Sequence, residues 1–273
     1  MKSKNILKVN NFNNTFNTSK SIKVIAVVNR KGGVGKTTTA FQIASWLAMK
    51  NKKILAVDSD PQGNFTKTAS NEIDAMGLYE ILTRRENIND LIEKLGENKF
   101  DLIHSDDELA RAESVLLSET DREYRLKEAF ADLKNEYDYV VIDTPPSLSV
   151  LTTNAMVAAD ILIVTAQADT YSTSGLMTLY NDVNVVKKYC NPNLIIDGIL
   201  ITRFAPRTSL AIHVREILKE LAEKMQTKLY NSVIRETTVI RESQAAGQSI
   251  FDYAPKSAGA LDYENFMLEL FRR

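Results

Sequence analysis

The chain has 273 residues and a mass of 30.6 kDa, 44% of its residues are hydrophobic, and its formal net charge at pH 7 is −1. This apolar content suffices for a sizeable core, whereas a charge near zero gives no global attraction to nucleic acid or to a membrane surface. With one cysteine (Cys190) and two histidines, an intramolecular disulfide framework and a cysteine-rich metal site are excluded.

The first twenty residues are rich in asparagine and lack an apolar stretch of the length that a signal peptide needs. We predict a flexible polar tail over residues 1–20 and one domain over residues 21–273, because no Pro/Gly/Ser-rich linker divides the remainder. No apolar run approaches the length of a transmembrane helix.

Short runs rich in valine and isoleucine predict strands at residues 22–28, 54–57, 139–142, 161–165 and 194–201. The segments between and after them predict helices at residues 38–50, 121–136, 172–189, 209–224, 237–246 and 258–271. Residues 77–94 predict one or two short helices. Strands that are apolar throughout are typical of a sheet covered on both faces, and their alternation with helices indicates an α/β fold. The predicted fold is a doubly wound, mostly parallel sheet flanked by helices.

The first predicted strand leads into the sequence Lys31-Gly32-Gly33-Val34-Gly35-Lys36-Thr37-Thr38, a modified form of the phosphate-binding pattern GxxxxGK[ST]. Glycines let the backbone form a nest of N–H groups that point at phosphate oxygens, and the following helix adds its positive N-terminal end. The order of strand, glycine loop and helix supports a phosphate site. All eight residues of this loop are therefore predicted to bind a nucleotide.

Three side chains of the loop receive specific roles. Lys36 is predicted to neutralise the outer phosphates, and the Thr37 hydroxyl is predicted to ligate Mg²⁺. Lys31 is unusual, because Lys36 already serves the phosphates of its own loop. Lys31 is free to reach across a dimer interface to a nucleotide in the partner subunit, and we assign both lysines to catalysis. The alternative, a glycine-rich surface turn with solvated lysines, is disfavoured by the preceding strand and by two acidic motifs.

These acidic motifs stand where predicted strands end. Asp58 ends the second strand, Asp60 follows in a turn held by Pro61 and Gly63, and Asp143 ends the third. Carboxyl ends of strands form the rim on which ligands bind in open α/β sheets. Asp143 and Asp58 join Thr37 as predicted Mg²⁺ ligands, Asp143 through a water, and Asp60 is predicted to orient or deprotonate an attacking water. A turn or helix-cap role for each aspartate is the alternative.

The sequences Lys-Gly-Gly-Val-Gly-Lys-Thr-Thr, Asp-Ser-Asp-Pro-Gln-Gly-Asn and Val-Ile-Asp-Thr-Pro-Pro together resemble the deviant Walker ATPases. More narrowly, the chain resembles the ParA/Soj-type partition ATPases over about residues 22–271. The resemblance implies a P-loop ATPase that binds ATP and Mg²⁺, forms a homodimer on ATP binding and hydrolyses ATP slowly to ADP and phosphate. It also implies that Lys31 contacts the nucleotide of the other subunit, and it gives Asp60 and Asp143 the roles stated above. Residues 100–105 resemble a family segment that usually has proline where this chain has His104.

The resemblance also implies partners. It places Arg207 and Arg241 at positions that contact nonspecific DNA, and it implies a ParB-like centromere-binding protein that stimulates hydrolysis during plasmid or chromosome partition. Arginine can bind a phosphate through two hydrogen bonds, and such binding requires no contact with a base. The alternative is a scatter of solvated charges paired with glutamates. We expect a cytoplasmic protein that joins the nucleoid in its ATP state.

Three other functions use the same kind of loop. A MinD-like, membrane-associated positioning ATPase needs a basic amphipathic C-terminus, but the last predicted helix carries Asp262, Glu264 and Glu269, so no membrane partner is expected. A redox ATPase of the nitrogenase iron-protein type needs two cysteines per subunit, and only Cys190 is present. A small-molecule ligase or kinase stays open, although no motif marks a metabolite pocket.

Overall fold

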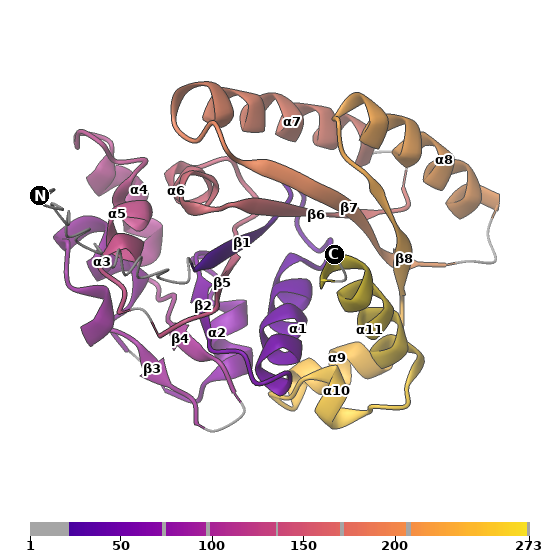
Figure 1. Cartoon of the computed structure of the whole chain (residues 1–273), viewed down its shortest axis with the longest axis horizontal. Coiled ribbons are helices and arrows are strands. Elements are labelled where there is room, and N and C mark those ends of the chain that lie inside the picture. The colour runs from indigo at the N-terminus through magenta and orange to yellow at the C-terminus, as the bar shows by residue number, and fades with distance from the viewer. Residues whose placement is uncertain are drawn as a thin grey trace, which may run out of the picture.

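The sheet is the frame of the molecule. The computed structural model describes residues 22–72, 75–96, 99–134, 136–169, 172–205 and 209–271. Within them, eight strands form one sheet in the order β3-β4-β2-β5-β1-β6-β7-β8 (Figure 1). The strands are β1 (Lys23–Val28), β2 (Ile54–Asp58), β3 (Glu93–Lys94), β4 (Asp101–Ile103), β5 (Tyr139–Asp143), β6 (Ile161–Gln167), β7 (Ile195–Phe204) and β8 (Leu229–Arg235). All neighbouring strands are parallel except β3 and β4, as the fold-class prediction requires.

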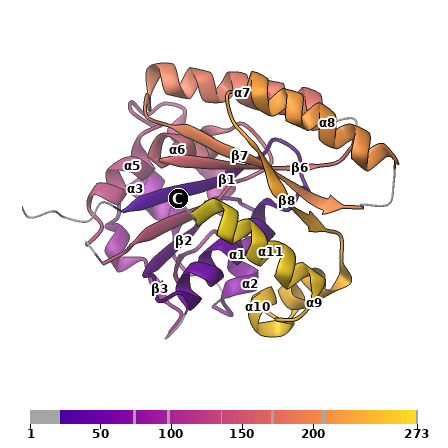
Figure 2. The same ribbon diagram turned by 45° about the vertical axis from the view of Figure 1, so that its right-hand side comes forward.

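Helices cover both faces of this sheet (Figures 1 and 2). The helices are α1 (Lys36–Met49), α2 (Asn64–Ala69), α3 (Leu78–Arg84), α4 (Leu109–Leu116), α5 (Arg125–Ala131), α6 (Val150–Ala158), α7 (Ser172–Tyr189), α8 (Ser209–Lys224), α9 (Thr238–Ala245), α10 (Ile250–Tyr253) and α11 (Ala258–Phe271), with a 3₁₀ turn at Ile88–Asp90. Helices α3 to α8 cover one face, and α1, α2 and α9 to α11 cover the other. None of the described helices is both long enough and apolar enough to span a bilayer.

The core has two layers because successive strand residues point to opposite faces. In β1, Val24 and Ala26 pack with α3 to α8, whereas Ile25 and Val27 pack with α1 and α11. Both sets are buried, which is why the strand reads as continuously apolar.

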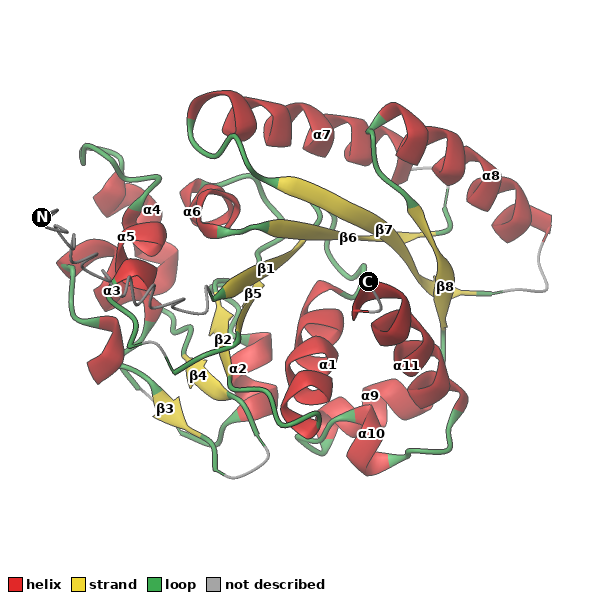
Figure 3. Ribbon diagram, in the orientation of Figure 1, coloured by secondary structure: helices red, strands yellow, loops and turns green. Residues whose placement is uncertain are grey.

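Most long elements match their predictions, and the differences have local causes (Figure 3). Helices α7 and α8 have the predicted bounds. Helix α1 begins two residues early, at Lys36, because Gly35 adopts the left-handed conformation that caps it. Helix α5 is much shorter than predicted, and Asp121 before it has a left-handed φ of 56°. Residues 93–94, predicted helical, instead form β3, and α2, α4, α6, α10, β4 and β8 were not predicted. The predicted tail, residues 1–20, lies outside the described residues.

The strand order positions the functional motifs. Strands β2, β5 and β1 are adjacent, and the register pairs Asp143 of β5 with both Asp58 and Val27. The carboxyl ends of three central strands therefore meet at one edge of the sheet, where the glycine loop and both acidic motifs begin.

The close approach of Gly77 to the backbone of His104 allows a test of this packing. A Cβ at Gly77 would lie 2.3 Å from the carbonyl oxygen of His104, whereas a Cβ at Gly175 in α7 has no atom within 4 Å. Gly77→Ala is expected to lower the free energy of unfolding by about 1–3 kcal/mol through overpacking. Gly175→Ala, the control, is expected to raise it by about 0.5–1 kcal/mol because glycine is unfavourable inside a helix. Urea titrations of both variants check this, and equal stabilities would contradict the packing described.

Candidate functional site

The glycine loop joins β1 to α1 in a conformation that requires glycine. Gly33 and Gly35 have φ angles of 73° and 78°, in the left-handed region that side chains disfavour. No side chain caps the N-terminus of α1. The first N–H groups of this fourteen-residue helix therefore point outward without a side-chain acceptor, which suits an anion.

Neighbouring strands hold the loop in place. Gln167, at the end of β6, donates from Nε2 to the Gly33 carbonyl at 2.8 Å, and Thr202 of β7 donates from Oγ1 to the Val34 carbonyl at 2.8 Å. Within the loop, the Lys31 N–H donates to the Asn29 side chain at 2.9 Å. These bonds fix the loop carbonyls and leave the helix end open.

A pocket of about 840 Å³ lies over the loop. Six of the eight loop residues predicted to bind the nucleotide line it: Gly32, Gly33, Gly35, Lys36, Thr37 and Thr38. Val34 is buried and Lys31 faces elsewhere. The opposite wall comes from α2 and from the end of β8, the short link after it and α9, which contribute Ile234, Thr237 and Arg241 respectively. Asp60 also lines the pocket.

Lys36 is a buried cation at the floor of the pocket. Its residue is only 6% exposed, and Nζ donates to the Lys31 carbonyl at 3.2 Å. Burial lowers the pKa of Lys36, while the charges of Asp143 and Asp60 oppose that shift. A lysine in such surroundings gains from an additional anion, and phosphate supplies one.

Asp143 is the least satisfied group of the site. The residue is fully buried, and neither carboxylate oxygen accepts a hydrogen bond of normal geometry from a described group. Burial raises its pKa well above the ordinary value, the nearby Asp58 charge adds to this, and the Thr37 hydroxyl and Lys36 oppose it. Oxygen atoms of this kind, beside the hydroxyl of Thr37, are ligands that Mg²⁺ prefers, directly or through water. The residues therefore fit the ion.

Asp58 has the opposite surroundings. Its oxygens accept hydrogen bonds from the Asp60 N–H at 3.1 Å, the Thr66 N–H at 2.8 Å and the Thr66 hydroxyl at 2.9 Å. Burial raises the pKa of Asp58 to about 6, and these hydrogen bonds limit the rise. The geometry favours Asp58 as the residue that holds the Asp60 turn; its role as a metal ligand stays a prediction.

Asp60 is held by its backbone while its side chain faces the pocket. The Ser105 hydroxyl donates to the Asp60 carbonyl at 2.6 Å, and Asp60 Oδ1 accepts from the Gln62 N–H at 3.1 Å. Sequence reasoning missed Ser105 and Thr66, and it missed the loop supports Gln167 and Thr202 as well. Each contacts the site from a distant segment, so no local pattern marks it.

Lys31 is paired within its own chain. Its Nζ forms an ion pair with Asp169, which follows β6, and both side chains are partly exposed. The neighbouring Arg30 pairs with Asp182 of α7 at 3.3 Å. Lys31 therefore does not line the pocket, and its contact with the nucleotide of another subunit stays a prediction.

The two predicted DNA contacts differ in what the structure describes. Arg207 lies outside the described residues. Arg241 is exposed on α9 and lines the mouth of the pocket. Its neighbours Arg203 and Arg235 are paired with Glu236 and Asp262. Arg241 is thus better placed than Arg203 or Arg235 to meet an external phosphate.

A glycine loop after the first strand of a parallel sheet, a buried lysine and an unsatisfied aspartate define a P-loop ATPase. The comparisons narrow this class. Residues 22–196 match the family model described as AAA domain. The sporulation initiation inhibitor protein Soj of Bacillus subtilis is 38% identical over 250 residues, which cover 91% of this chain and 98% of Soj.

Two solved structures are also similar. A plasmid partition protein of Borrelia burgdorferi bound to AMPPNP has a TM-score of 0.79 at 28% identity, covering 92% of this chain and 99% of that one. A cobyrinic acid a,c-diamide synthase of Mycobacterium smegmatis with an ATP analogue and magnesium has a TM-score of 0.74 at 32% identity, covering 92% and 95%. The chain belongs to this AAA-domain family and, within it, to the ParA/Soj-type partition ATPases.

The unsatisfied Asp143 generates a stability prediction. Asp143→Asn removes a buried charge beside Asp58 and is expected to raise the melting temperature of the nucleotide-free protein. Each 1 kcal/mol gained should appear as a rise of roughly 2–4 °C. Asp58→Asn, the matched control on the adjacent strand, replaces one of two accepting carboxylate oxygens by an amide NH2 group, which leaves at least one of three donors without its acceptor and is expected to cost about 1–3 kcal/mol. Thermal melts of both variants without nucleotide check the contrast; destabilisation by Asp143→Asn would contradict it.

The stability difference between Asp143→Asn and the wild type should depend on pH. Because the folded-state pKa of Asp143 is raised, the folded protein retains a proton over a range in which the unfolded chain has lost it. The stability linked to that proton is present below the ordinary value of 3.8 and is lost as pH rises through the raised pKa. The advantage of Asp143→Asn over the wild type is therefore expected to grow from mildly acidic to neutral pH. Urea midpoints at several pH values measure this, and an advantage that shrank would contradict it.

Proposed function

We propose that the chain is a DNA-carried partition ATPase that forms a homodimer on ATP binding, binds DNA without sequence preference, and is stimulated in hydrolysis by a ParB-like centromere-binding protein. The observation that carries the proposal is the arrangement of Lys36 and the buried Asp143 under an open helix end, together with a second lysine, Lys31, that pairs with Asp169 and does not line the pocket. The similarity to Soj and to a plasmid partition protein supports the cellular role.

ATP and Mg²⁺ occupy the pocket over the glycine loop in this proposal. The loop N–H groups and Lys36 hold the phosphates, and Thr37 and Asp143 hold Mg²⁺, with or without intervening water. Bound Mg²⁺ neutralises negative charge on the phosphates. Support comes from the orphaned Asp143 oxygens and from the related structure that contains an ATP analogue and magnesium.

Asp60 positions the attacking water. Its carboxylate faces the pocket, while Asp58 and Ser105 hold its backbone, so the side chain starts from a fixed base. Neither contact supplies positive charge to a developing transition state, which suits a slow intrinsic rate. The partner protein is proposed to complete the site, and hydrolysis then releases the dimer from DNA.

The cellular location follows from these partners. We propose a cytoplasmic protein that associates with the nucleoid while ATP is bound, since the DNA-binding state and the ATP state coincide. The MinD-like alternative predicts lipid binding instead. The described part of α11 contains Asp262, Glu264 and Glu269, and Asp262 is paired with Arg235, so this helix offers little attraction to an anionic surface.

The role of Lys31 can be separated from nucleotide binding. Lys31→Gln is expected to bind ATP with nearly wild-type affinity, because Lys31 does not line the pocket, yet to lose ATP-dependent dimerisation. Arg30→Gln removes the adjacent cation and its ion pair with Asp182, and it should still dimerise. Sedimentation velocity with a slowly hydrolysed ATP analogue, alongside fluorescent-ATP titration, measures both properties. Normal dimerisation of Lys31→Gln would rule out its proposed contact with the partner's nucleotide.

DNA binding is the decisive test of the proposed function. Random-sequence duplex DNA is expected to bind tightly with ATP or a slowly hydrolysed analogue and weakly with ADP. Arg241→Ala should weaken binding about tenfold or more and reduce the slope of log affinity against log salt by about 1 for each phosphate that the variant no longer neutralises. Arg111→Ala, which removes an exposed arginine on the opposite face of the sheet, is the control.

The outcomes of the DNA experiment are distinct. Loss of DNA binding in Arg241→Ala with unchanged ATP affinity supports a DNA contact. A parallel loss of ATP affinity would assign Arg241 to the nucleotide pocket, which it lines. Wild-type protein that dimerises with ATP but binds no DNA would overturn the proposal, and ATP-dependent sedimentation with anionic liposomes would then favour the MinD-like function.

A further inference from the structure

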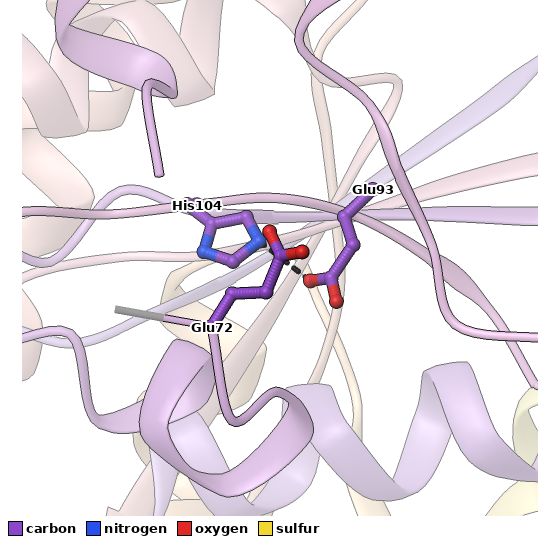
Figure 4. A group of neighbouring side chains, drawn as sticks. All are labelled: Glu72, Glu93 and His104. Carbon is purple, nitrogen blue, oxygen red and sulfur yellow. Dashed lines mark hydrogen bonds and ion pairs between the residues drawn. The ribbon is translucent and has the colours of Figure 1, made fainter. Parts of the chain in front are cut away.

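Three side chains with metal-binding atoms converge at the β3–β4 edge of the sheet, away from the nucleotide pocket (Figure 4). Glu93 belongs to β3, His104 directly follows β4, and Glu72 lies after α2. The antiparallel register pairs Glu93 with Leu102, so His104, two residues beyond Leu102, projects from the same face of the sheet. One ligand atom from each of the three residues lies within 4.8 Å of the other two.

His104 is the buried centre of the cluster. Its side chain is 3% exposed, and its Nε2 lies 2.6 Å from Glu93 Oε2. The imidazole is therefore fixed with one ring nitrogen facing the carboxylates (Figure 4). His104 does not line the nucleotide pocket, so the imidazole is a feature that the proposed ATPase function does not explain.

Both carboxylates lie beside the same ring nitrogen of His104 (Figure 4), and Ser70 links the Glu93 carboxylate to the backbone of Glu72. Ser70 donates from Oγ to Glu93 Oε1 at 3.0 Å, and its hydroxyl oxygen accepts from the Glu72 N–H at 3.0 Å. Within the described residues, Glu93 has no ion-pair partner other than His104, and Glu72 has none. Two like charges this close are unfavourable without a cation, and the described lysines and arginines do not supply one.

We propose that Glu72, Glu93 and His104 bind a divalent transition-metal ion, with Zn²⁺ as the best match. One imidazole nitrogen and two carboxylate oxygens are established zinc donors, and three protein ligands leave a fourth position for water. The nitrogen donor favours Zn²⁺ over Mg²⁺, which prefers oxygen ligands throughout. When the metal binds, the proton on Nε2 is released to solvent. The Glu93 carboxylate then changes from hydrogen-bond acceptor to metal ligand, and the Ser70 hydroxyl orients that carboxylate.

The metal site lies next to the segment that supports Asp60. Ser105 directly follows His104, donates to the Asp60 carbonyl, and donates its N–H to the Thr66 hydroxyl at 3.0 Å. The His104 carbonyl accepts from the Leu78 N–H at 2.9 Å. A metal bound to His104 therefore fixes the end of β4. Ser105, at that end, holds the Asp60 carbonyl and the Thr66 hydroxyl. The proposed metal site does not depend on DNA binding or dimerisation.

The experiment uses the two histidines as separate probes. Full-length protein is freed of metal by a chelator, returned to excess Mg²⁺ without nucleotide, and titrated with Zn²⁺ while the imidazole signals are followed by NMR. His213→Asn assigns the signals, because His104 and His213 are the only histidines. The His104 ring signals are expected to shift saturably with one Zn²⁺ per chain, both in the wild type and in His213→Asn.

The variant Glu72→Gln distinguishes a metal site from a simple His104–Glu93 ion pair. Glu72 is exposed, so Glu72→Gln leaves folding unaffected, yet removal of a ligand should weaken Zn²⁺ binding about tenfold or more. Glu113→Gln, at another exposed glutamate on α4, is the matched control and should bind as the wild type does. His104 signals that ignore Zn²⁺, or equal affinities of Glu72→Gln and Glu113→Gln, would overturn the proposal and leave a buried His104–Glu93 ion pair.

Discussion

The burial of two carboxylates on adjacent strands is the constraint on which the site depends. Asp58 and Asp143 face each other in register at the ends of β2 and β5, and both are fully buried. Asp58 is satisfied by three donors, whereas Asp143 has none of normal geometry among the described groups. The fold thus keeps the unfavourable buried carboxylate of Asp143 in place. Such locally unfavourable arrangements persist at functional sites when the surrounding structure fixes them.

Hydrogen bonds from neighbouring strands keep the segments around Asp143 from rearranging. The glycine loop is tied to β6 and β7 by Gln167 and Thr202, and the Asp60 turn is tied to β4 by Ser105. The loop, the turn and Asp143 therefore cannot relax separately to relieve the charge. A ligand that brings a cation to Asp143 and an anion to Lys36 stabilises the folded state by its own binding free energy, which couples nucleotide binding to the stability of this edge of the sheet.

The central sheet was predictable from the sequence because its strands are buried on both faces and therefore almost entirely apolar, as in β1, where every residue after Lys23 is apolar and buried. Strand β8 was not, since it lies at an edge and carries Asn231 and Ser232 among partly exposed positions. The site was predictable where its residues are contiguous, as in the glycine loop. Ser105 and Gln167 reach the site only through the tertiary fold, so neither leaves a local signal.

The position of Lys31 bears on the proposal that one loop serves two subunits of a dimer. Its backbone is fixed by the hydrogen bond to Asn29, but its side chain points to Asp169, away from the pocket of its own chain. Both partners are partly exposed, and an ion pair of that kind contributes at most about 1 kcal/mol. Exchange of Asp169 for a phosphate therefore costs little. The loop backbone can stay in place while a single side chain changes partner, so the proposed dimer requires no rearrangement of the residues that line the nucleotide pocket.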